Sequence, residues 1–196
     1  MLPRSSRTRT DGGFTLVELM VTVGLLGVVV LALTAIMLSS SHLQSRTVRR
    51  AQVQAGSRQA LSIITTELRE AGADPSYPPL GLVGIVDARA HRIQVRADIN
   101  GDGSLQTTEP SEDITFIYDD TTHTVARDAG SGPVVMLSNV TGMELTYFDA
   151  ANTPLTALPL SAADAARVHV IGVTLTSEDR DSHPITLTTR VQLRNL

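Results

Sequence analysis

An almost unbroken apolar run from Phe14 to Leu38 constrains this chain more than any other feature. It follows a short leader with three arginines, and it is close to the length of about 20 residues that spans a bilayer. One carboxylate, Glu18, lies inside the run, at the fifth position after Gly13. A charged side chain in such a segment costs roughly 2.5–3.5 kcal/mol, so Glu18 is expected to have a functional partner.

Two simpler interpretations of the run are weaker. A secretory signal peptide has an apolar region of about 7–15 residues, which is too short, although Ser39, Ser40 and Ser41 could mimic its cleavage site. A plain membrane anchor has the right length. Neither interpretation explains why a glutamate follows Gly13-Phe14 so closely.

Residues 12–20, Gly-Gly-Phe-Thr-Leu-Val-Glu-Leu-Met, resemble the class III signal of type IV prepilins and of type II secretion pseudopilins. The resemblance implies that prepilin peptidase cuts between Gly13 and Phe14, and that Phe14 becomes the N-methylated terminus. It also implies that Glu18 meets the N-terminal amine of a neighbouring subunit in a filament. The leader would be cytoplasmic and the rest of the chain periplasmic.

Composition excludes several other classes of protein. Cleavage after Gly13 would leave 183 of the 196 residues, and the part after the apolar run suffices for one compact domain. Loss of three arginines and one aspartate with the leader would change the net charge from −4 to −6. An acidic chain without basic stripes gives no footprint for nucleic acid. The sequence contains no cysteine, zinc-type histidine cluster, phosphate loop or nucleophile elbow, so nothing in it predicts an enzyme.

The segment from Phe14 to Gly72 is predicted to form one long helix or two consecutive helices. Its first part, 14–38, is the membrane or filament-core helix, and its second part, 39–73, is amphipathic. An apolar stripe at helical spacing predicts the face on which a sheet packs. The stripe consists of Leu61, Ile64, Leu68 and Ala71. Gly72 and the Asp74-Pro75 pair end the helix.

Residues 74–196 read as an antiparallel β domain. Short β-prone runs are separated by Gly, Asp, Asn and Pro, and they cover 81–87, 92–97, 113–119, 122–127, 134–137, 143–147, 168–176 and 185–193. Residues 150–166 are predicted to form a long surface loop. The fold class is therefore α+β, a long N-terminal helix packed on a C-terminal antiparallel sheet. This agrees with the architecture of pilins, and residues 140–149 and 191–195 resemble the later strands of minor pilins of the PilW type and minor pseudopilins of the GspJ type.

A second motif, residues 98–109, fits the calcium-loop pattern D-x-[DN]-x-[DN]-G-x₅-E without a departure. Oxygen ligands at alternate positions, a glycine at the sharp turn and a closing glutamate suit one Ca²⁺ ion. The predicted ligands are Asp98, Asn100, Asp102, Ser104 through its carbonyl, Gln106 through a water, and Glu109. The alternative is an ordinary polar turn, since Asn-Gly and Asp-Gly pairs favour turns in any case.

The sequence thus predicts a minor pilin: an inner-membrane, single-pass subunit that joins the tip of a type IV pilus and starts or caps its assembly. Its expected partners are prepilin peptidase, other minor and major pilins or pseudopilins, and the inner-membrane assembly platform. A minor pseudopilin of a type II secretion system is the first alternative. A membrane-anchored or secreted calcium-binding module, unrelated to filaments, is the second.

Overall fold

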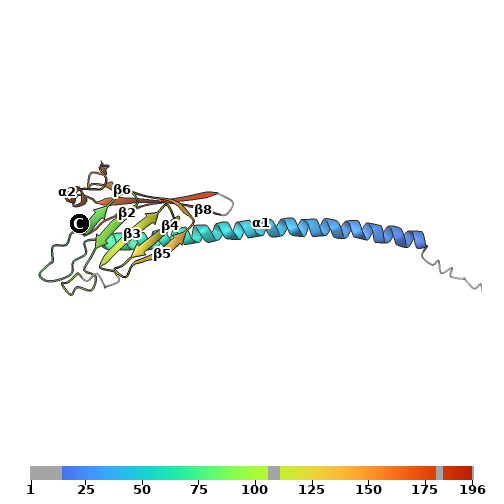
Figure 1. Ribbon diagram of the computed structural model, residues 1–196, viewed down its shortest axis with the longest axis horizontal. Helices are drawn as coiled ribbons and strands as arrows, with labels where there is room; N and C mark the ends of the chain where they lie inside the picture. Colours follow the sequence, from blue (N-terminus) through green and yellow to red (C-terminus); the bar gives the residue numbers. More distant parts are fainter. Residues whose placement is uncertain (1–14, 106–110, 180–182, 196) are drawn as a thin grey trace, which may run out of the picture. The chain divides into compact units, whose positions relative to one another are not determined.

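The computed structural model describes residues 15–105, 111–179 and 183–195, and for 39–46 it describes only the helical backbone (Figure 1). The expected helical segment is a single helix, α1 (Leu16–Glu70). No proline interrupts it, and its glycines, at 24, 27 and 56, are too few to break it. The chain divides into two compact units, Met1–Val48 and Arg49–Leu196, so α1 contributes to both.

In the first unit, α1 is apolar on every side. Its segment Leu16–Leu38 has 23 residues, a mean hydropathy of 2.7 and no buried residue. A helix that is hydrophobic all round requires an apolar environment, either lipid or other helices. By length and composition this segment can therefore cross a membrane.

The second unit contains two antiparallel sheets, where the sequence predicted one. The first sheet has the order β1-β2-β3-β4-β5. Its strands are β1 (Ile85–Ala88), β2 (Arg92–Arg96), β3 (Asp113–Asp119), β4 (Thr124–Asp128) and β5 (Pro133–Ser138). The second sheet has the order β7-β6-β8-β9. Its strands are β6 (Val140–Phe148), β7 (Pro154–Leu155), β8 (Val170–Glu178) and β9 (Pro184–Gln192).

One hydrophobic core joins α1 to both sheets. The predicted stripe is buried, with Ile64 and Leu68 fully enclosed and Leu61 and Ala71 nearly so. The first sheet contributes Phe116 and the second contributes a set of alternating residues to the same core. These residues are Met143, Leu145, Tyr147, Ile171, Val173, Leu175 and Val191. The alternating pattern predicted strands with one buried and one solvated face, and β6 and β8 confirm this prediction.

Polar contacts also attach α1 to the sheets. Glu67 accepts from the Arg127 Nε on β4 at 2.9 Å, and the buried hydroxyls of Ser57 and Ser177 are 2.8 Å apart. The helix ends where Gly72, in the left-handed region with φ of 78°, donates its N–H to the Arg96 carbonyl. The sequence predicted this end of the helix from the same glycine.

The predicted loop at 150–166 is more ordered than expected. It contains the two-residue strand β7 and a short helix, α2 (Ala162–Ala165). The Ser161 hydroxyl caps α2 by accepting the Asp164 N–H at 3.1 Å. Both elements are shorter than the window over which periodicity can be read, which explains why the sequence did not predict them.

Candidate functional site

The start of α1 places Glu18 in the first helical turn. The Thr15 hydroxyl accepts the Glu18 N–H at 3.2 Å, and the Thr15 carbonyl accepts the Leu19 N–H at 3.1 Å. Thr15 is therefore the N-cap, and Glu18 occupies the third helical position after it. Thr15-Leu-Val-Glu18 has the spacing of a capping box, in which an acidic residue three positions after the cap supports the helix start.

The spacing from Thr15 to Glu18 already indicates this capping role, whereas the sequence analysis assigned Glu18 only a role in filament assembly. A carboxylate in the first turn also faces the positive end of the helix dipole. Within the part of the chain that the structure describes, the Glu18 carboxylate has no hydrogen-bond or ion-pair partner, and the residue is exposed. Gly13 and Phe14 lie outside the described residues, so the cleavage position remains a prediction.

The calcium-like loop is held by hydrogen bonds between its own residues. The Asp98 carboxylate is buried and accepts the N–H groups of Gly101 at 2.8 Å and Gly103 at 3.1 Å. The Asn100 Oδ1 accepts the Asp102 N–H at 2.9 Å, and Asp102 accepts the Ser104 N–H at 2.8 Å. The expected side chains of the first half are thus gathered in one tight loop.

The loop is anchored to the segment that follows α1. The Asp98 N–H donates to the Ala73 carbonyl at 2.8 Å. Gly101 has a φ of 72° and lies close to Pro75, so a Cβ at this position would be 3.3 Å from the proline ring. Asp74 beside it accepts the Ser76 hydroxyl and the Gly81 N–H, and these bonds, the Ser76 bond most strongly, lower its pKa below the ordinary value.

The second half of the predicted ligand set is not described, because Gln106 and Glu109 lie outside the described residues. Among the residues that are described, no group of three or more His, Cys, Asp or Glu side chains is placed to hold a metal ion. The motif also uses an asparagine and a carbonyl oxygen, which do not belong to these four residue types. The donors present are hard oxygens, the chemistry that Ca²⁺ prefers, and each Asp98 oxygen has a second lone pair beyond the one that accepts its N–H bond.

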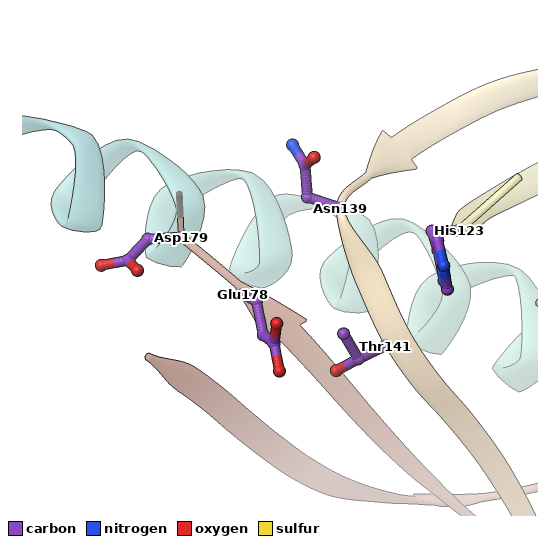
Figure 2. Close-up of a pocket in the computed structure, with 5 residues that line it drawn as sticks. All are labelled: His123, Asn139, Thr141, Glu178 and Asp179. Atoms are coloured by element: carbon purple, nitrogen blue, oxygen red, sulfur yellow. The ribbon is translucent and has the colours of Figure 1, made fainter. Parts of the chain in front are cut away.

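A polar pocket of about 210 Å³ lies where the two sheets meet (Figure 2). Its lining residues are His123, Asn139, Thr141, Glu178 and Asp179. Figure 2 shows that these side chains come from separate segments and do not converge on one point. The positive φ angles of His123 and Asn139, 53° and 60°, shape tight turns, whose carbonyls accept the N–H groups of Val140 and Glu178. The geometry favours a structural junction over a reaction centre.

Residues 8–39 match the family model described as "Prokaryotic N-terminal methylation motif". The matched range contains Gly13, Phe14 and Glu18 together with the apolar helical segment of the first unit. No curated protein matches the chain. The match supports a class III prepilin leader of the kind that type IV pilin-like proteins carry, and such a leader implies processing by prepilin peptidase.

Proposed function

We propose that this protein is a minor pilin, cleaved by prepilin peptidase between Gly13 and Phe14, that helps to initiate or cap a type IV pilus. Two observations coincide in support of the proposal. The methylation motif covers residues 8–39, and within this range the apolar helical segment Leu16–Leu38 has no buried residue. The mature chain would sit in the inner membrane with Arg49–Leu196 in the periplasm, and then pass into the filament tip. Its role is structural, and no catalytic step is assigned to it.

In this mechanism, Glu18 supplies the charge that orients an incoming subunit. In an apolar filament core, a carboxylate and a neighbour's protonated amine attract each other far more strongly than in water, whereas either charge alone is penalised. The described part of the chain provides no partner for this carboxylate, which agrees with a partner on another subunit. The amine would be that of the neighbour's methylated N-terminus.

Substitutions at Glu18 can separate this role from helix capping. Glutamine keeps the capping-box geometry but removes the charge, whereas alanine removes both. We expect Glu18→Gln and Glu18→Ala to be cleaved normally, and both to be depleted about tenfold or more in sheared filaments. Glu70→Ala, at the exposed end of the same helix, is the matched control. Wild-type incorporation of Glu18→Gln would leave Glu18 with capping alone and refute the pairing role.

A deletion strain of the native host distinguishes a subunit of the type IV pilus from a subunit of the type II secretion system. Deletion of a minor pilin should reduce the number of surface pili, and the wild-type gene should restore it. Deletion of a minor pseudopilin should instead leave pili intact and retain secreted proteins in the periplasm. The second result would move the protein to type II secretion.

We also propose that residues 98–109 bind one Ca²⁺ ion, with Asp98, Asn100, Asp102, the Ser104 carbonyl, Gln106 through a water, and Glu109 as ligands. The supporting observation is the buried Asp98 carboxylate, fixed by two N–H donors at the first position of the motif. A bound ion would stabilise the fold by about 2.7 kcal/mol at a free concentration a hundredfold above its dissociation constant.

Melting of the full chain in a neutral detergent tests the calcium site. We expect millimolar Ca²⁺ to raise the melting temperature relative to chelator, and Mg²⁺ to do so less. Asp98→Asn keeps one acceptor oxygen for the two N–H groups that Asp98 binds, and Glu109→Gln keeps the size of the side chain. Both variants lower the ligand charge, so they should remove the calcium response. Equal melting of wild type with calcium and with chelator would show that the motif is only a polar turn.

A further inference from the structure

The turn between β1 and β2 is fixed from both sheets. The Arg89 N–H donates to the Arg92 carbonyl at 2.9 Å and closes the turn. The other carbonyls of the turn accept hydrogen bonds from β3 and β6. The Arg89 carbonyl accepts the Tyr147 hydroxyl and the Ala90 carbonyl accepts the Leu145 N–H, both at 2.8 Å. The His91 carbonyl accepts the Tyr118 N–H at 2.9 Å. A turn held in this way presents its side chains from a rigid base.

A pocket of about 400 Å³ opens beside this turn. Cavities of roughly 300–1,000 Å³ are typical of small-ligand sites. One wall is apolar and aromatic, formed by Ile117, Tyr118, Leu158 and Pro159. The other wall is basic, formed by Arg89, His91 and Arg92. The His91 Nδ1 lies 2.6 Å from the Met143 carbonyl, which can only accept, so Nδ1 carries a proton and the ring is held in place.

The two arginines of the basic wall share one carboxylate. Asp87 is the acidic partner of both, with its Oδ2 3.0 Å from the Arg89 Nε and 3.2 Å from the Arg92 Nε. Arg92 also lines a second pocket with Asp113 and Asp128. Asp113 is paired with Arg96 at 2.8 Å, and Asp128 accepts the N–H groups of Gly130 and Gly132.

Both arginines also retain unused donors. Their contacts with Asp87 involve Nε, and the structure gives their Nη groups no acceptor among the residues it describes. The Arg92 Nε is buried and makes no hydrogen bond within the described chain, although it lies 3.2 Å from the Asp87 Oδ2. A planar guanidinium with free Nη groups matches a carboxylate, which it can bind through two parallel hydrogen bonds.

We propose that this pocket binds an organic acid in which one carboxylate is attached to a ring, either a sugar acid or an aromatic acid. The carboxylate lies against the Nη groups of Arg89 and Arg92, and the ring lies against Tyr118 and Pro159. The planar fork of Nη groups on each arginine fits the two oxygens of a carboxylate through two parallel hydrogen bonds. The site lies wholly within Arg49–Leu196, so the inference does not depend on the role in filament assembly.

Titration calorimetry on the full chain in a neutral detergent tests this proposal. Glucuronate and benzoate represent the two sources of the acid, and glucose and benzyl alcohol are their neutral counterparts. We expect at least one acid to bind at millimolar concentration, and its neutral counterpart to bind at least about tenfold more weakly. The acid that binds identifies the source of the ring.

Charge-neutral variants locate the site. Arg89→Gln and Arg92→Gln should each weaken binding of the acid about tenfold with little change in the melting temperature, because ion pairs of side chains that are 59% and 41% exposed contribute little to stability. Arg190→Gln is the matched control, since Arg190 lies over the Phe148 ring in the second sheet. Absence of binding by either acid, equal binding of the neutral counterparts, or unchanged affinity in both pocket variants would overturn the proposal.

Discussion

Substitution of Leu68 by alanine is expected to be one of the most damaging changes in the second unit, Arg49–Leu196. Leu68 lies on the buried face of α1, is 0% exposed, and packs in the core that both sheets share. Truncation of a fully enclosed leucine costs the transfer free energy of the lost methyl groups and a cavity, roughly 3–5 kcal/mol in total. For a unit of this size, that corresponds to a fall of about 6–20 °C in melting temperature.

The assay can use the protein's own aromatic residues. The chain has no tryptophan and three tyrosines, and the Tyr147 ring is 1% exposed, so near-ultraviolet circular dichroism of tyrosine reports the packed state. Ile63→Ala is the matched control on the same helix, because Ile63 is 37% exposed and its loss should cost far less. If Leu68→Ala and Ile63→Ala melted within about 2 °C of each other, α1 would not be the support of both sheets.

Two further perturbations follow from particular contacts. Gly172→Ala should destabilise the second sheet by about 1–3 kcal/mol, because the new Cβ would overlap the Thr146 hydroxyl, and Thr146→Ala in the same chain should recover most of the loss in a thermal melt. Asp149 has a pKa lowered from 3.8, first by the N–H of Thr153, so its stabilising effect is present above 3.8 and is lost as the pH falls through the lower folded value. The melting temperature should therefore drop below pH 3.8, and less steeply in Asp149→Asn than in wild type.

Local patterns predicted much of the architecture. The stripe from Leu61 to Ala71 indicated the buried face of α1, and the alternation in 143–147 and 185–193 indicated half-buried strands. These signals depend only on residues that are close in sequence. The division into two sheets cannot be predicted from such signals, because β5 and β6 are separated only by Asn139 yet belong to different sheets. That partition is decided by long-range packing around α1.

The candidate sites likewise differ in whether their residues are close together in the sequence. The order of Gly13, Phe14 and Glu18 was readable because the motif is contiguous, and the capping spacing from Thr15 to Glu18 was equally readable although it was missed. No sequence pattern marked Asp179, whose side chain is 7% exposed and accepts the His183 N–H at 3.1 Å. The pocket beside Arg89 and Arg92 had no sequence signal, because its apolar wall comes from Leu158 and Pro159, far along the chain.

The N-terminus of the mature protein, determined from its native host, tests the proposed prepilin processing. We expect a chain that begins at N-methylated Phe14 and lacks the 13-residue leader. Gly13→Val should retain the leader, because a side chain next to the cleaved bond would crowd the peptidase, whereas Gly12→Val should mature normally. A mature chain that begins at Met1 or near His42, or normal maturation of Gly13→Val, would contradict the assignment to the pilin class.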